Sequence, residues 1–168
     1  MTNYTDRTVW YCCHPVAPTV AELEPFIGPG DFAMRCAVDC NIQRALRWLR
    51  WLRVSFPECT FIAPWIASIM SGDDDSDPAQ REAGLVDCGA VAYLVQNAVM
   101  VGGRIGSGGR REMDAATSVA DLTFLGAEPP EVVTGATFAQ WRVRHEPHLH
   151  VYAGGRCVCG ALDQGAGL

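Results

Sequence analysis

The segment between residues 98 and 116 combines residue types that could hold a ligand and act on it. An apolar run at residues 98–101 predicts a buried strand, a glycine-rich turn follows at residues 102–109, and a helix-forming run begins near Arg110. Backbone N–H groups at a helix start attract anions, and glycine lets a ligand approach the backbone closely. An anion or a sugar hydroxyl could bind there beside Glu112, which we place in the first helical turn. A tight turn followed by a glutamate that favours the helix dipole explains the same pattern.

A second carboxylate, Asp87, lies in a run that can form a helix. Residues 79–96 are rich in alanine, follow a proline and are too numerous for a typical strand. We therefore predict a largely buried helix, although residues 90–95 taken alone would suit a strand. An unpaired carboxylate among apolar neighbours is costly, so Asp87 should face a pocket or a partner. A hydrogen bond with Arg81 or with a backbone group is the structural alternative.

The first β-prone run, at residues 8–13, ends at His14 and Pro15. Valine, tryptophan and tyrosine occur in it, as in a central strand of an α/β sheet. Folds of this class place ligands at the carboxyl ends of such strands. Residues 15–31 contain four prolines, so we predict a loop with at most one helical turn, near residues 20–23. The length of this loop indicates that it covers something.

Helices and strands alternate along the chain up to residue 130. Apolar residues at helical spacing predict an amphipathic helix over residues 32–54. Short apolar runs at residues 60–63 and 119–124 predict two further strands. Strands that alternate with helices imply a parallel sheet with right-handed crossovers. The predicted fold class is α/β: a Rossmann-like parallel sheet of about four to five strands flanked by helices, with a C-terminal β-hairpin extension.

We predict an α/β domain at residues 1–130 and a C-terminal extension at residues 131–168, consisting of a hairpin and a flexible tail. A two-residue turn at residues 154–155 would place four potential zinc ligands on one face: His148, His150, Cys157 and Cys159. The spacing lacks the usual Cys-x2-Cys motif, so a plain hairpin is the expectation. Residues 71–78 contain four aspartates without the spacing of a calcium loop, and we expect a solvated, mobile lid there.

The composition restricts the class of protein. With 168 residues, 49% of them hydrophobic, the chain can bury one sizeable core. A net charge of −6 and a pI near 5.1 argue against binding of a nucleic-acid polymer, and the arginines of residues 44–53 are expected to form a solvated helix edge. The apolar runs are too short to span a membrane, and no signal peptide is evident. We therefore expect a soluble, cytoplasmic protein whose eight cysteines are reduced.

The order of several short motifs resembles the nucleoside 2-deoxyribosyltransferase superfamily, in particular its small phage and bacterial domains. The resemblance covers roughly residues 8–130 and implies a Rossmann-like fold. Its motifs are Tyr11-Cys-Cys-His-Pro15, Asn41 in a helix with Ala45 and Leu49, Phe61-Ile-Ala-Pro-Trp65, Asp87 before a strand, and Gly108-x-x-x-Glu112 with Ala116.

This resemblance implies cleavage of the N-glycosidic bond of a nucleoside or nucleotide, by a transferase or a hydrolase, without a cofactor or a metal. Glu112 would be the nucleophile at the anomeric carbon, and Asp87 a carboxylate near the leaving base. Two carboxyl groups also flank the oxocarbenium-like transition state in glycosidases. Ser107 and Gly108 would hold the sugar or a 5′-phosphate. The other substrate-binding residues would be Tyr11, His14, Pro15, Trp65 and Arg104.

The implied partner is a small molecule, a nucleoside or a nucleotide, and homo-oligomer assembly is possible on the same resemblance. Two other functions remain open at this point. One is a non-catalytic nucleotide-binding module, because the same glycine-rich turn binds phosphates without chemistry. The other is cleavage of the nicotinamide bond of NAD.

Overall fold

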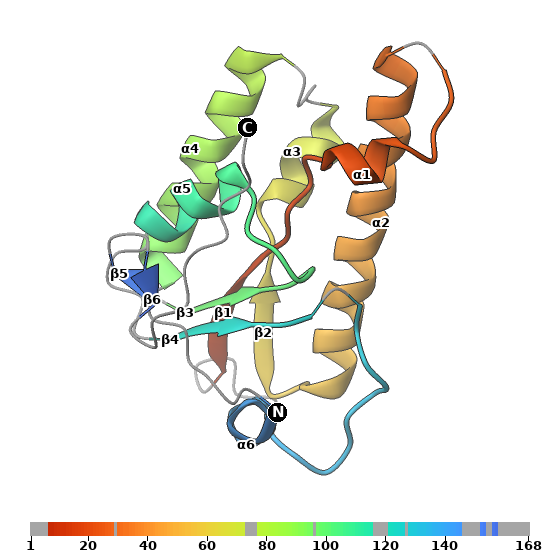
Figure 1. The fold of residues 1–168 in the computed structure, drawn as a ribbon. Helices are drawn as coiled ribbons and strands as arrows, with labels where there is room; N and C mark the ends of the chain where they lie inside the picture. The colour runs from red at the N-terminus through yellow and green to blue at the C-terminus, as the bar shows by residue number, and fades with distance from the viewer. Residues whose placement is uncertain are drawn as a thin grey trace.

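The computed structural model describes residues 7–28, 30–72, 77–95, 97–115, 121–126, 128–145, 152–153 and 156–157. All pairings of its main sheet are parallel, in the strand order β2-β1-β3-β4. The strands are β1 (Thr8–Cys13), β2 (Cys59–Ile62), β3 (Asn97–Met100) and β4 (Asp121–Phe124). Helices flank this open sheet (Figure 1). The predicted α/β class, with a parallel sheet between helices, is confirmed.

The helices are α1 (Val20–Leu23), α2 (Gly30–Ser55), α3 (Trp65–Ser71), α4 (Pro78–Val95), α5 (Ser107–Ala115) and α6 (Phe138–His145). The predictions of α1, α2 and α4 as helices are confirmed, and residues 90–95 belong to α4 rather than to a strand. Two helices, α3 and α6, were not predicted. Pro64 ends the apolar run of β2 but also starts α3, because proline suits the first turn of a helix.

The sheet separates two apolar layers, because successive side chains of a strand point to opposite faces. Trp10 and Cys12 of β1 point into the layer covered by α2 and α6. Tyr11 and Cys13 point into the other layer, which α4 covers together with Trp65 of α3. Helices α2 and α4 lie on opposite sides of the molecule in Figure 1. Tyr11 is therefore directed toward the side of α4 and α5.

Helix α6 packs into the first layer. Phe138 is 1% exposed, and its ring centroid lies 4.9 Å from that of Trp10 and 5.0 Å from that of Phe56. Trp141 is also buried and contacts Trp51 at a centroid distance of 5.2 Å. The predicted boundary at residue 130 therefore does not separate two packing units, since this part of the expected extension completes the main core.

Two short strands are described in the tail, β5 (Tyr152–Ala153) and β6 (Arg156–Cys157), which pair antiparallel. The other residues of the predicted hairpin, including His148, His150 and Cys159, lie outside the described residues. So do residues 73–76 of the acidic loop. Within the described part of the chain, no group of three or more His, Cys, Asp and Glu residues is placed to hold a metal ion. No helix in that part is both long and apolar enough to cross a membrane.

Candidate functional site

A pocket of about 840 Å³ opens where β1 and β3 end. Its volume lies within the range of small-molecule sites. In this strand order the chain leaves β1 toward β2 on one side and returns to β3 on the other, and such a switch point is where open α/β sheets bind ligands. The walls come from α2, α3, α4 and α5 and from the segment after β1. Its lining includes His14, Pro15, Trp65, Ser107, Gly108 and Glu112.

Glu112 is held against the pocket wall by Tyr11. Its side chain is buried, with the residue 5% exposed, and Oε2 accepts a hydrogen bond of 2.7 Å from the Tyr11 hydroxyl. Burial is the main cause that raises the pKa of Tyr11 far above its usual range, and the charge of the nearby Glu112 is the second cause. The phenol therefore keeps its proton and acts as the hydrogen-bond donor. The other oxygen, Oε1, lies toward Gly108, where an added Cβ would be 4.0 Å away. One carboxylate oxygen is thus fixed, and the other borders the pocket at a residue without a side chain.

The helix that carries Glu112 starts earlier than predicted. Helix α5 begins at Ser107 rather than near Arg110, so Glu112 lies in its second turn and its first turn contains no acidic residue. The prediction that Glu112 sits in the first turn is therefore wrong, and Tyr11 rather than the helix dipole positions its carboxylate. Gly109 belongs to the helix as well. An added Cβ there would stand 3.0 Å from the Cys13 sulfur, so glycine lets α5 pack closely on β1.

Two thiols share this region with Glu112. Burial is the main cause that raises the pKa of Cys88 to about 11, and burial followed by the Glu112 charge raises the pKa of Cys13 well above its usual range. Both cysteines therefore remain protonated at neutral pH. A thiol is a poor nucleophile in that form, so Glu112 is the better candidate.

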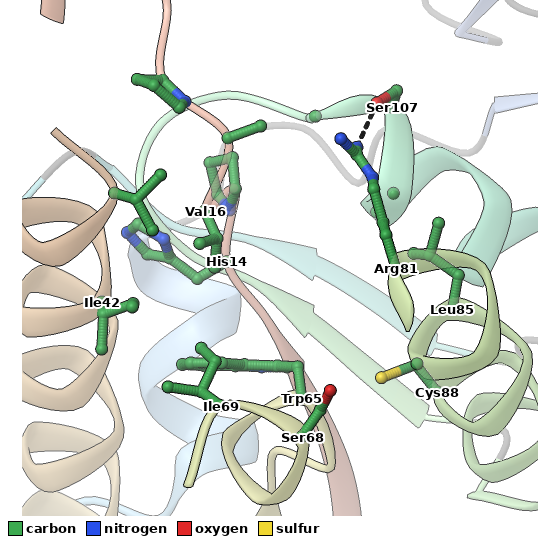
Figure 2. A pocket seen from close by; sticks show the side chains of 18 of the residues that line it. His14, Val16, Ile42, Trp65, Ser68, Ile69, Arg81, Leu85, Cys88 and Ser107 are labelled. Carbon is green, nitrogen blue, oxygen red and sulfur yellow. Dashed lines mark hydrogen bonds between the residues drawn. The ribbon is translucent and has the colours of Figure 1, made fainter. Parts of the chain in front are cut away.

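Asp87 does not join Glu112. It is exposed on α4 and is not among the pocket-lining residues. The pocket side of α4 carries Arg81, Leu85 and Cys88, which share one helical face, whereas Asp87 is rotated by about 100° from Cys88. The prediction that Asp87 faces this pocket is corrected. The alternative, a hydrogen bond between Asp87 and Arg81, is not among the contacts of the described residues, and Arg81 donates instead to the Ser107 hydroxyl at 3.3 Å (Figure 2).

Trp65 is the first residue of α3, and its ring lines the pocket between Ile42 of α2 and Cys88 of α4 (Figure 2). Its indole N–H donates to the backbone carbonyl of Cys12 at 3.0 Å. This bond fixes the plane of the ring, because it ties the far edge of the indole to the end of β1. An aromatic face held in place in this way suits the stacking of a planar ligand.

His14, at the end of β1, lines the same pocket but is largely buried, at 6% exposure. Burial lowers its pKa to about 4, so the ring is neutral at pH 7. Neither ring nitrogen has a hydrogen-bond partner among the described residues. Gly102 packs against it with a φ of +93°, and a Cβ there would approach the His14 Nε2 to 2.7 Å.

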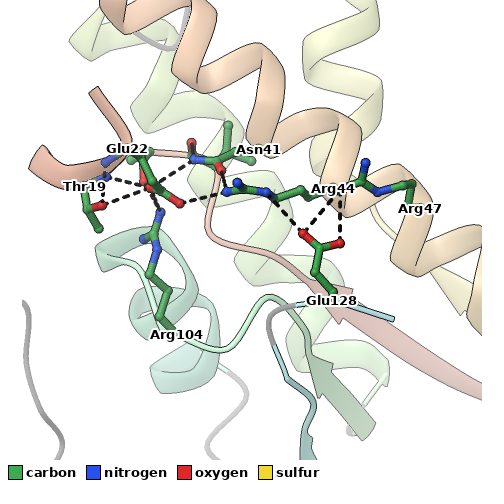
Figure 3. A network of polar contacts seen from close by, with 9 residues as sticks. Thr19, Glu22, Asn41, Arg44, Arg47, Arg104 and Glu128 are labelled. Carbon is green, nitrogen blue, oxygen red and sulfur yellow. Dashed lines mark hydrogen bonds and ion pairs between the residues drawn. The ribbon is translucent and has the colours of Figure 1, made fainter. Parts of the chain in front are cut away.

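Arg104 is not among the residues that line the pocket. It donates to the Ala17 carbonyl at 2.7 Å and to the Glu22 carboxylate at 2.9 Å (Figure 3). Glu22 also pairs with Arg44 at 3.1 Å, while Asn41 donates to the Val16 carbonyl at 3.0 Å. The prediction of Arg104 as a substrate-binding residue is corrected. Its contacts instead hold the proline-rich segment after β1, part of which lines the pocket as predicted.

This network makes part of the stability depend on pH. Partial burial alone would raise the pKa of Glu22, but the Thr19 backbone N–H, Arg104 and Asn41 outweigh it and lower the pKa. Ionised Glu22 therefore stabilises the fold above its unfolded pKa of about 4.3, and this contribution is lost as the pH falls through the folded value. Glu22→Gln should lower the free energy of unfolding by about 1.5 kcal/mol at pH 7.

The measurement is urea unfolding at neutral pH and at about pH 3, where the difference between wild type and variant should be smaller. Glu24→Gln is the matched control, because Glu24 is exposed and has no partner among the described residues. An equal effect of Glu22→Gln at both pH values would contradict this role.

Sequence reasoning missed one wall of the pocket. The N-terminal half of α2 contributes Asp31, Met34, Arg35, Val38, Asp39 and Ile42. These residues recur every three or four positions, so their periodicity was visible. Nothing in the pattern distinguished a face that lines a pocket from one that contacts the sheet.

Comparisons with models of known protein families, with curated proteins and with solved structures find no match to this chain. The candidate function therefore depends on the geometry of the pocket.

Proposed function

We propose that the protein cleaves the N-glycosidic bond of a nucleoside or nucleotide, as a hydrolase or a transferase, with Glu112 as the nucleophile. The observation that carries the proposal is the buried Glu112 carboxylate on the pocket wall, held by the Tyr11 hydroxyl at 2.7 Å. Such a carboxylate is placed to attack a sugar carbon as its bond to a base breaks. The resemblance to the nucleoside 2-deoxyribosyltransferase superfamily points to the same chemistry.

In this mechanism, a Glu112 carboxylate oxygen bonds to the anomeric carbon as the carbon–nitrogen bond breaks. The electron pair of that bond leaves with the base, which takes up a proton from solvent. Water, or a second base, then attacks the anomeric carbon and releases the Glu112 carboxylate, with loss of a proton from the attacking group. Hydrogen bonding by Tyr11 orients the carboxylate through both steps.

The pocket also offers places for the other parts of such a substrate. Trp65 would stack against the base. The Ser107 hydroxyl and the free backbone N–H groups of the first α5 turn, including that of Gly108, would hold the sugar or a 5′-phosphate. Arg81 lies beside Ser107 and adds a positive charge there. A nucleoside 5′-monophosphate matches this set better than an uncharged nucleoside does.

Arg81→Gln tests the phosphate part of this assignment. The catalytic efficiency, kcat/KM, should fall about ten- to one-hundredfold for nucleotides, because a hydrogen bond between charged groups is lost, and should change little for nucleosides. Arg50→Gln removes the same charge from the exposed face of α2 and serves as the control. A similar loss for both substrate classes would remove Arg81 from phosphate binding.

The proposal is tested by incubating the full chain with nucleosides, 5′-nucleotides and NAD and measuring released base by chromatography. Mass spectrometry of the acid-quenched protein should also show a covalent sugar adduct that Glu112→Gln lacks. Release of nicotinamide alone would identify an NAD glycohydrolase. Binding without release of any base would leave a non-catalytic nucleotide-binding module.

A further inference from the structure

The α2 wall of the pocket carries two opposite charges with no assigned role. Arg35 and Asp39 are one helical turn apart, and both line the pocket. Neither forms a hydrogen bond or an ion pair with another described residue, although their spacing would allow them to pair with each other. By contrast, Arg44 and Arg47 on the same helix are both paired with Glu128. A free cation and a free anion thus face the same cavity.

The position of α2 relative to Trp65 indicates which part of a ligand Arg35 and Asp39 would meet. In Figure 2, Ile42 of α2 lies on one side of the pocket, Arg81 and Ser107 lie on the other, and Trp65 lies between. Glu112 belongs to the same helix as Ser107. A base stacked on Trp65, with its sugar toward α5, would therefore present its outer edge to α2.

The chemistry of the two side chains then restricts the base. A carboxylate accepts two parallel N–H groups, and a guanidinium donates two parallel N–H groups. Guanine presents two donors side by side, N1–H and the 2-amino group, together with two neighbouring acceptors, O6 and N7. Adenine has no carbonyl oxygen, and hypoxanthine lacks the 2-amino group. Of these three purines, only guanine can form two hydrogen bonds with the carboxylate and two with the guanidinium.

We propose that Asp39 and Arg35 bind the edge of the base and select guanine, with Asp39 accepting from N1–H and the 2-amino group and Arg35 donating to O6 and N7. This inference rests on the proposed function only in taking the base as the occupant of the Trp65 face. Both residues act in recognition, and neither touches the bond that breaks.

The test is isothermal titration calorimetry of the full chain with guanosine, inosine and adenosine 5′-monophosphates, in ribo and 2′-deoxyribo forms. Wild type should bind the guanine nucleotide about tenfold more tightly than the hypoxanthine nucleotide, the equivalent of one net hydrogen bond to a charged group. Asp39→Asn should remove this difference. Arg35→Gln should weaken both of these nucleotides equally, because both carry O6 and N7.

Asp114→Asn, on an exposed part of α5, and Arg50→Gln are the matched charge controls. Equal affinity of wild type for the guanine and hypoxanthine nucleotides would overturn the inference, as would an unchanged ratio in Asp39→Asn. Base release from the same nucleotides is measured in parallel. Base release without preference for guanine would overturn this inference alone. Guanine-selective binding without base release would overturn the glycosidase proposal alone. Absence of binding would overturn both.

Discussion

Replacement of Glu112 by glutamine should reduce base release about a thousandfold or more. The reason is chemical, because an amide cannot form the glycosyl ester that a carboxylate forms. A thousandfold loss is about 4 kcal/mol, half of the roughly 8 kcal/mol that even a modest enzyme provides. Single-turnover release of base from the best substrate of the panel measures it. A folded Glu112→Gln protein that releases base at the native rate would end the assignment of Glu112 as nucleophile.

Two further variants separate chemistry from structure at this residue. Glutamine keeps an oxygen that can accept the Tyr11 hydrogen bond, whereas Glu112→Ala removes the acceptor of the buried Tyr11 hydroxyl and should cost about 1–3 kcal/mol of stability. Tyr11→Phe keeps the carboxylate but removes its orientation. We expect about a tenfold loss of rate from Tyr11→Phe, since one hydrogen bond is lost while the nucleophile remains.

The second large effect is expected on stability. Phe138→Ala should lower the free energy of unfolding by about 3–5 kcal/mol, because a large ring is removed from a packed interior and the cavity cannot be filled. The ring lies 4.9 Å from Trp10, 5.0 Å from Phe56 and 5.4 Å from Phe61, centroid to centroid. Urea unfolding followed by tryptophan fluorescence gives the value, since Trp10 lies in the same cluster.

Val132→Ala provides the control for that measurement. Val132 lies in the same part of the chain but is exposed, so its truncation should change stability by less than about 0.5 kcal/mol. If Phe138→Ala cost no more than Val132→Ala, α6 would not belong to the main core, and the predicted boundary at residue 130 would stand.

Local sequence patterns were enough to predict the strands and helices whose residue types and length fit only one kind of secondary structure. Strand β1 was predicted with its observed bounds, Thr8–Cys13, because six β-prone residues are followed directly by His14 and Pro15, where a proline ends the strand. Helix α4 was predicted correctly because a run starting at a proline and too long for a strand has few other conformations. Helix α6 was not predicted. Its eight residues are few for a helical pattern, and the contact that stabilises it joins Phe138 to Trp10, which no local window contains.

The candidate site divides in a similar way. Of the site residues that the motif resemblance implied, Tyr11 is fully buried, does not line the pocket and reaches the site only through its hydrogen bond to Glu112. Trp65, Ser107 and Glu112 were implied by the same resemblance, and the fold brings all three to the pocket. This was possible because strand ends and the loops after them meet at one edge of a parallel sheet, so position in the chain predicts position in space.

Asp87 and Arg104 could be placed only by the tertiary structure. For Asp87, the decisive quantity is the rotation of α4 about its own axis, which depends on how its apolar residues pack on β1 and α5. For Arg104, the deciding fact is that its guanidinium pairs with Glu22 instead of facing a ligand. Glu22 is 82 residues away in the sequence, but its carboxylate lies 2.9 Å from the Arg104 guanidinium in the fold. Residue type and spacing show that a side chain can do chemistry, but its direction and its partner follow from long-range packing, because the free energy of burial depends on which surfaces meet.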